Sequence, residues 1–180
     1  MLERGNFILG EVDSIHRKMG FHTPPFSIRK FLLHFPEYSI RPISMPQGVD
    51  GMLRVVEGRP FILFRMESLE ERNRLTIAHE VGHHRLGHPI QEEHLYRENM
   101  GMHTSDPREE QEAFFFASEL LVPLSMLNRY FPDDPLTCPT PQREKMVGEL
   151  AKVFLVSKAL MRRRLRDLGF MRRMAAGAEL

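Results

Sequence analysis

The chain has almost no cysteine and no long apolar run. Cys138 is the only cysteine among 180 residues, which excludes an internal disulfide and leaves it no second thiol with which to chelate a metal. No apolar stretch approaches membrane-spanning length, and the first residues, Met1 to Gly5, lack the apolar region of a signal peptide. Long internal repeats and low-complexity segments are also missing. These absences predict a cytoplasmic protein without a membrane segment, in which Cys138 has no catalytic role.

The composition is that of a soluble globular protein, with 42% hydrophobic and 27% charged residues. A chain of 180 residues is long enough for one full domain with a small appendage. The net charge of +1 is unevenly distributed, since residues 105–141 carry a net charge of −5 and residues 142–173 one of +7. The two segments either form a partner surface or neutralise each other in the fold.

Periodicity predicts a mostly helical α+β fold. Helical spacing of apolar residues indicates helices over 6–19, 27–35, 69–86 and 108–121. Three short β-branched or aromatic runs, 40–44, 52–56 and 61–64, predict a small antiparallel sheet of about three strands. Glu57-Gly58 suits a tight hairpin turn between the last two strands. Ser68 and Glu71 fit a capping box at the start of the helix over 69–86.

One motif carries the chemistry. His79, Glu80 and His83 form an HExxH sequence inside the predicted helix 69–86. Residues four apart lie on one face of a helix, so both imidazoles can reach a single metal ion. Zinc favours such ligands, and the adjacent glutamate can hold a water molecule and take its proton. The alternative interpretation is a core helix with hydrogen-bonded histidines.

The same helix contains a glycine, Gly82, which costs up to about 1 kcal/mol relative to alanine. A glycine kept at such a position usually has a packing reason. It predicts the close approach of a neighbouring helix.

A zinc site of this kind needs a third protein ligand. The extended motif HExxHxxGxxH would require glycine at 86 and histidine at 89, where the chain has Leu86 and Pro89. Gly87 and His88 are each one position out of place, which argues against the extended motif.

The other source of a third ligand is a glutamate from a second helix. Asp106-Pro107 predicts the start of such a helix, and acidic residues in its first turn, Glu109 and Glu110, are explained by the helix dipole. Glu112 directly precedes an apolar run and is less easily explained in that way. Glu112 is therefore best placed to be the third ligand.

Two blocks of sequence extend this pattern, from Arg74 through His83 and from Glu109 through Pro123. They resemble the RFTxAHExGH and ExxEAxxFAxxLLxP motifs of the ImmA/IrrE metallopeptidases, which occur in phages, mobile elements and bacterial stress responses. The resemblance covers residues 50–123. It implies a zincin-like core with one Zn²⁺ per chain. The implied zinc ligands are His79, His83 and Glu112, and the implied general base is Glu80.

The C-terminal segment also resembles this family. Residues 150–169 are similar to its FxVSxxAxxxRLxxLG pattern, with Leu155 at the place where glycine is common. The resemblance implies a metallopeptidase domain over 1–141 and a helix-turn-helix-like pair over 142–180. Direct DNA binding is one use for the basic residues of this pair: Lys158, Arg162, Arg163, Arg164 and Arg166. We favour a basic helix pair that packs on the core or docks the substrate.

The resemblance implies a zinc endopeptidase that cuts a DNA-binding transcriptional repressor once and so relieves repression. Such a mechanism needs a donor for the oxyanion. The candidates are His88, His94, Tyr96, His103 and Tyr130. Glu109 or Glu119 could orient a ligating histidine. Two other functions remain open, a regulatory or toxin–antitoxin-type binding module without proteolysis, and a DNA-binding regulator with a structural zinc.

Overall fold

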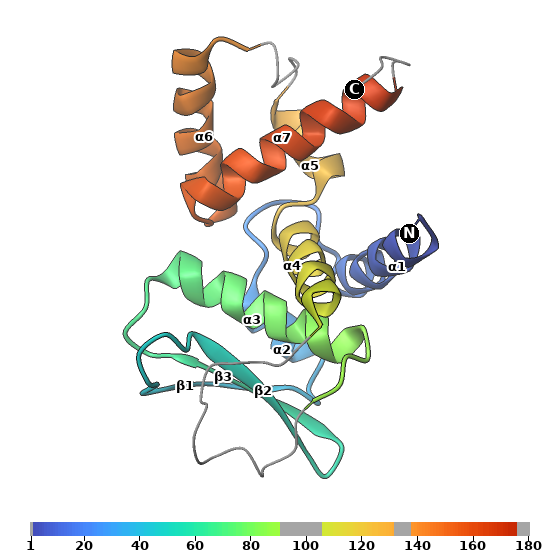
Figure 1. Cartoon of the computed structure of the whole chain (residues 1–180), viewed down its shortest axis with the longest axis vertical. Helices are drawn as coiled ribbons and strands as arrows, with labels where there is room; N and C mark the ends of the chain where they lie inside the picture. Colours follow the sequence, from blue (N-terminus) through green and yellow to red (C-terminus); the bar gives the residue numbers. More distant parts are fainter. Residues whose placement is uncertain (1, 91–105, 132–137, 176–180) are drawn as a thin grey trace.

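The computed structural model describes residues 2–90, 106–131 and 138–175. The elements in these ranges are α1 (Leu2–Met19), α2 (Ile28–His34), β1 (Ser39–Ile43), β2 (Gly51–Val56), β3 (Arg59–Arg65), α3 (Glu70–Arg85), α4 (Pro107–Leu121), α5 (Leu124–Tyr130), α6 (Thr140–Phe154) and α7 (Lys158–Ala175). The mostly helical α+β class is thereby confirmed. Figure 1 shows α3 above the sheet, α1 and α4 on the far side of α3, and α5, α6 and α7 beyond them. None of the helices in the described ranges has the length and apolar character to cross a membrane.

The sheet has three strands in the order β1-β3-β2. A tight turn joins β2 to β3 as a hairpin, and Glu57 and Gly58 both have positive φ there, 51° and 75°. This conformation matches the twist of the flanking strands, so the predicted hairpin is confirmed. The prediction that the whole sheet is antiparallel is wrong, because β1 pairs with β3 in parallel, with Ile40 opposite Ile62. β3 lies between the other two strands. It runs antiparallel to β2, its partner in the hairpin, and parallel to β1.

The start of α3 differs from the predicted capping box. The N-cap is Leu69, which makes no side-chain cap bond, rather than Ser68. The helix therefore begins one residue later, and the third helical position is Arg72 instead of Glu71. Arg72 pairs with Asp50 at 2.6 Å and so ties the helix to the loop before β2.

Helices α3 and α4 touch at Gly82. A Cβ at this position would lie 3.1 Å from the carbonyl oxygen of Ala113, 3.1 Å from Cδ1 of Phe116 and 3.2 Å from Cα of Ala113. The two backbones can approach this closely because neither Gly82 nor Ala113 carries a large side chain. The close approach predicted from the glycine is confirmed, and it sets which face of α4 meets the HExxH helix.

Replacing Gly82 should therefore separate the helices. Gly82→Leu is expected to destabilise the fold by about 1–3 kcal/mol, despite leucine's better helix propensity, because the side chain would overlap the α4 backbone. Gly10→Leu on α1 is the matched control, since a Cβ there meets no atom within 4 Å and the residue is exposed. Urea unfolding should show opposite changes in midpoint for the two variants. A Gly82→Leu protein as stable as wild type would mean that the helices are not held together here.

The C-terminal pair α6 and α7 packs on the rest of the molecule through a buried arginine. The side chain of Arg164 is 0% exposed and forms an ion pair with Glu119 of α4. It also donates to the carbonyl oxygen of Val122, with Nε at 3.0 Å. One acidic and one basic segment therefore neutralise each other at this point inside the fold.

A second buried arginine joins α3 to two distant segments. Arg74 is 7% exposed and donates to the carbonyl oxygens of Phe26, at 2.7 Å, and Leu155, at 2.9 Å. Leu155 has a left-handed backbone, with φ of 54°, and ends α6 where glycine is common. Ser157 then accepts a hydrogen bond from the backbone N–H of Leu160 at the start of α7. The predicted helix pair is present, with its turn held against the HExxH helix.

Candidate metal and peptidase site

Three side chains from two helices converge on one point. His79 and His83, one turn apart on α3, place their Nε2 atoms 3.0 Å from each other. Glu110, in the first turn of α4, brings its carboxylate to 3.1 Å from Nε2 of His79 and 3.4 Å from Nε2 of His83. The packing of Gly82 on Ala113 explains this meeting, because Glu110 lies three residues before Ala113 and so on the same face of α4.

The spacing of these atoms fits a zinc ion. Zinc bonds to imidazole nitrogen and carboxylate oxygen are about 2.0–2.2 Å, so tetrahedral ligands lie about 3.3–3.5 Å apart. The ligand atoms of His79, His83 and Glu110 all lie within 4.8 Å of one another. Two imidazole nitrogens and a carboxylate are also the donor set that catalytic zinc sites use, with one position left for water.

Glu80 lies beside this cluster in an environment that disfavours its charge. The residue is 3% exposed, and within the described part of the chain its Oε2 has no hydrogen-bond partner. Burial, and then the nearby carboxylate of Glu110, raises the pKa of Glu80 to about 8. In its ionised form, this buried oxygen, which has no partner among the described residues, is suited to accept a hydrogen bond from water, and the helix that carries both histidines holds it in place.

The start of β2 packs directly against Glu80. A Cβ on Gly51 would lie 3.7 Å from Oε1 of Glu80, and only 2.3 Å from Cγ2 of Thr76. Any larger residue at this position would push the strand away from α3. Gly51 thus allows the sheet to cover one side of the glutamate, which helps to explain why Glu80 is so deeply buried.

Glu112 does not join the two histidines of the motif. Its carboxylate accepts hydrogen bonds from Nε of Arg4 at 2.8 Å and from Nε2 of His88 at 3.1 Å. These partners hold the pKa of Glu112 below its usual range, with the Arg4 hydrogen bond the larger cause. The side chain faces α1, because position 112 lies to one side of the α4 face that meets α3. The structure therefore brings Glu110, rather than the predicted Glu112, to the third position.

The other predicted residues lie apart from the cluster or beyond the described residues. Glu119 pairs with Arg164 and accepts from the backbone N–H of Leu124 at 3.1 Å, at the opposite end of α4 from Glu110. Tyr130 packs edge-on against Phe154, with ring centroids 5.7 Å apart. The remaining oxyanion candidates, His94, Tyr96 and His103, fall outside the residues that the structure describes.

His88 contacts His83 on the side of its ring opposite to His79 and Glu110. Its Nδ1 lies 2.9 Å from Nδ1 of His83, the ring nitrogen that points away from His79 and Glu110. The residue is 6% exposed. His88, one position out of place for the extended motif, thus packs against the HExxH helix and does not face the same point as His79 and Glu110.

The basic residues of α7 mostly have partners inside the protein. Arg162 forms an ion pair with Glu144 of α6 at 2.7 Å. Arg163 lies over the ring of Phe114, with Cζ 4.3 Å from the centroid. Arg164 is fully buried. This arrangement favours a helix pair that packs on the core over one that presents a row of free cations.

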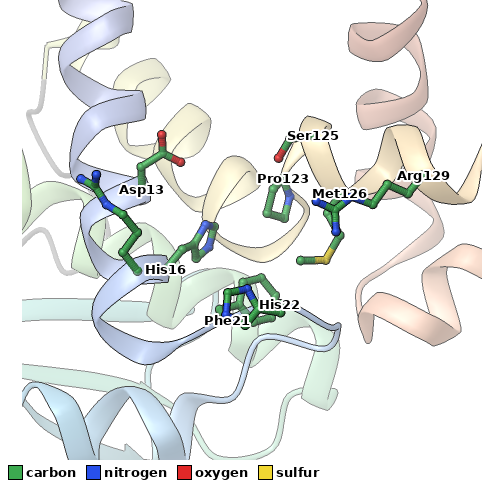
Figure 2. Close-up of a pocket in the computed structure, with 9 residues that line it drawn as sticks. Asp13, His16, Phe21, His22, Pro123, Ser125, Met126 and Arg129 are labelled. Atoms are coloured by element: carbon green, nitrogen blue, oxygen red, sulfur yellow. The ribbon is translucent and has the colours of Figure 1, made fainter.

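A hollow of about 330 Å³ lies elsewhere, between the end of α1 and the junction of α4 with α5. Figure 2 shows His16 pointing into it from α1, above Phe21 and His22. Nε2 of His16 lies 3.0 Å from the carbonyl oxygen of Leu120, and burial lowers the pKa of His16. None of the residues predicted for metal binding or catalysis lines this hollow, so the chemistry of α3 and α4 is separate from it.

The fold and site define a protein of the HExxH class, with the motif on a helix that lies over a small sheet and a glutamate supplied by a second helix. Residues 37–166 match the peptidase family described as IrrE N-terminal-like domain. The chain belongs to this family, as the sequence resemblance predicted. A comparison with curated proteins gave no match.

Proposed function

We propose that this chain is a zinc-dependent endopeptidase that cuts a DNA-binding transcriptional repressor. The observation that carries the zinc part is the convergence of His79, His83 and Glu110 beside a buried glutamate, Glu80, whose Oε2 has no partner among the described residues. Membership of a peptidase family supports a protein substrate.

Each of the four side chains has a distinct role in this proposal. His79, His83 and Glu110 hold the metal, and Glu80 is the general base. When bound, zinc would supply Lewis-acid activation of water and of the peptide carbonyl. Glu80 takes a proton from the water whose oxygen forms a bond to the carbonyl carbon. It then returns the proton to the amine nitrogen as the carbon–nitrogen bond breaks.

The repressor substrate rests on the resemblance to the ImmA/IrrE metallopeptidases. Cleavage would relieve repression of phage, mobile-element or stress-response genes in the cytoplasm. The first substrate to test is the product of any neighbouring gene that encodes a helix-turn-helix repressor. Its incubation with zinc-loaded protein should give two fragments, and an intact repressor would contradict this part of the proposal while leaving the zinc site in place.

Zinc affinity separates the two candidate glutamates. Glu110→Gln should weaken zinc binding by more than about 100-fold because it removes a ligand, whereas Glu112→Gln should retain a measurable one-to-one site. Competition with a chromophoric chelator measures both. Glu70→Gln is the control, with the same change of charge on the exposed first turn of α3. Zinc binding that survives Glu110→Gln but is lost in Glu112→Gln would restore Glu112 as the third ligand.

A DNA-binding regulator is the alternative that the sequence left open. The burial of Arg164 counts against it, because this side chain is not available to phosphate groups, and Arg162 is already paired with Glu144 at the surface. Salt-sensitive DNA binding that persists in Glu80→Gln would favour the alternative over the peptidase. A non-proteolytic binding module would bind the repressor and leave it whole with all four site residues intact.

A further inference from the structure

We propose that His88, Glu112 and Arg4 form a hydrogen-bonded relay that orients His83 and fixes its tautomer for metal binding. This inference rests on the proposed function for the identity of the metal ligands. It assigns positioning roles to three residues that do not face the metal point themselves. We call these three residues the relay.

The contacts run in one unbroken line from the back of His83. Nδ1 of His83 lies 2.9 Å from Nδ1 of His88, and Nε2 of His88 lies 3.1 Å from Oε2 of Glu112. The same oxygen accepts from Nε of Arg4 at 2.8 Å and lies 2.7 Å from Nη2 of Arg4 in an ion pair. The side chains of His83 and His88 are 6% and 4% exposed, so water has little access to the middle of the line.

The chemistry of the four side chains determines which group donates and which accepts in each hydrogen bond. The ionised carboxylate of Glu112 can only accept, so Nε2 of His88 must carry a proton and donate it. A neutral His88 then has an unprotonated Nδ1, which accepts from Nδ1–H of His83. His83 therefore carries a lone pair, and no proton, on Nε2. That nitrogen is the one that faces His79 and Glu110.

If the Glu112 carboxylate were lost, it would no longer determine which nitrogen of His88 carries the proton. His88 could then carry its proton on Nδ1 and donate to Nδ1 of His83. A neutral His83 would in turn hold its proton on Nε2, where it blocks metal binding. Partners that orient a ligating histidine in this way typically change metal affinity by about 10–100-fold when they are removed.

The relay brings the N-terminal helix into the site. Arg4 lies on α1, outside the residues 37–166 that match the peptidase family. Besides Glu112 it contacts the carbonyl oxygen of Leu86 at 3.3 Å, just after α3 ends. Arg4 therefore holds the carboxylate of α4 and the end of the HExxH helix together. Helix α1 is thus part of what positions His83.

The tautomer is tested directly by nuclear magnetic resonance. Long-range nitrogen–proton correlation spectra of the full-length chain at neutral pH should show the proton of His88 on Nε2, both with and without zinc. In Glu112→Gln the zinc-free protein should show His88 as a mixture of both tautomers. A wild-type His88 that carries its proton on Nδ1 would overturn the proposal. This readout does not depend on cleavage, so it stands apart from any failure of the proposed function.

Zinc affinity measures the consequence. His88→Ala and Glu112→Gln should each weaken zinc binding by about 10–100-fold and Arg4→Met by less, while Glu70→Gln stays near wild type. His88 is buried, so Glu112→Gln and Arg4→Met carry the test if His88→Ala does not fold. A double variant of His88→Ala and Glu112→Gln should bind zinc no more weakly than His88→Ala alone, because both changes break one line. Affinity within about threefold of wild type in Glu112→Gln, or additive losses in the double variant, would overturn the relay.

Discussion

Glu80→Gln is expected to keep the fold and the zinc ion and to lose repressor cleavage by about 100- to 10,000-fold, the usual contribution of a general base. The glutamine has nearly the same shape, and the three proposed ligands are untouched. It cannot accept a proton from water at neutral pH. The measurement is the initial rate of repressor cleavage, with zinc content and thermal unfolding recorded on the same samples.

The control for this experiment is Glu70→Gln, which removes one negative charge from the exposed first turn of the same helix. Its cleavage rate should match that of wild type. Cleavage by Glu80→Gln at more than about a tenth of the wild-type rate would exclude Glu80 as the base. Loss of zinc in the variant would instead mean that Glu80 belongs to the metal site.

Glu119→Gln is expected to destabilise the protein by about 3–5 kcal/mol, because it leaves the buried guanidinium of Arg164 without its main counter-charge. Arg164 is 0% exposed and the Glu119 side chain 11%, so water cannot replace the lost carboxylate. Asp167, at 3.2 Å from Nη1, remains as a partner but is 39% exposed. Glutamine still offers an oxygen to the N–H of Leu124, so the loss reports mainly on the charge. Urea unfolding midpoints give the change in free energy.

Glu144→Gln is the matched control for the buried pair. It breaks the ion pair with Arg162, whose partners are both well exposed, and should leave the unfolding midpoint nearly unchanged. Replacing both buried partners, with Glu119→Leu and Arg164→Met, should recover part of the stability lost in Glu119→Gln. A Glu119→Gln protein with wild-type stability would show that the carbonyl of Val122 and the carboxylate of Asp167 satisfy the arginine without the charge of Glu119.

The sequence predicted the HExxH helix, the hairpin and the helix pair, because each depends on short-range signals. His79 and His83 are held four apart by the helix itself, and Glu57-Gly58 determines its own turn. Gly82 also signalled a contact with a second helix. These features need no knowledge of what lies far away in the chain.

Which glutamate lies beside the two histidines depended on a longer-range fact, the rotation of α4 about its own axis. The contact of Gly82 with Ala113 sets this rotation and turns Glu110 toward the histidines, while Glu112 faces α1. The sequence did offer one signal for this rotation, because Gly82 and Ala113 are small residues that can pack against each other. Acidic residues are common in the first turn of a helix because they interact favourably with the helix dipole. Glu110 was therefore explained in this way and not predicted to lie beside the histidines.

Local sequence signals also could not predict the parallel pairing of β1 with β3 or the hydrogen-bond partners of Arg74. The sheet places β3 between β1 and β2, and no residue pattern within the three strands indicates this order. Arg74 finds partners 48 and 81 residues away. The residues around Arg74 in the sequence do not indicate either partner.

Those two long spans of Arg74 have a consequence for the order of assembly during translation. The HExxH helix is complete once residue 85 has been made, yet its buried guanidinium has no second acceptor until residue 155 leaves the ribosome. A contact of such large separation forms late, since the intervening chain must close first. The hydrogen bond that ties α3 to the turn before α7 can thus form only after that turn has been synthesised.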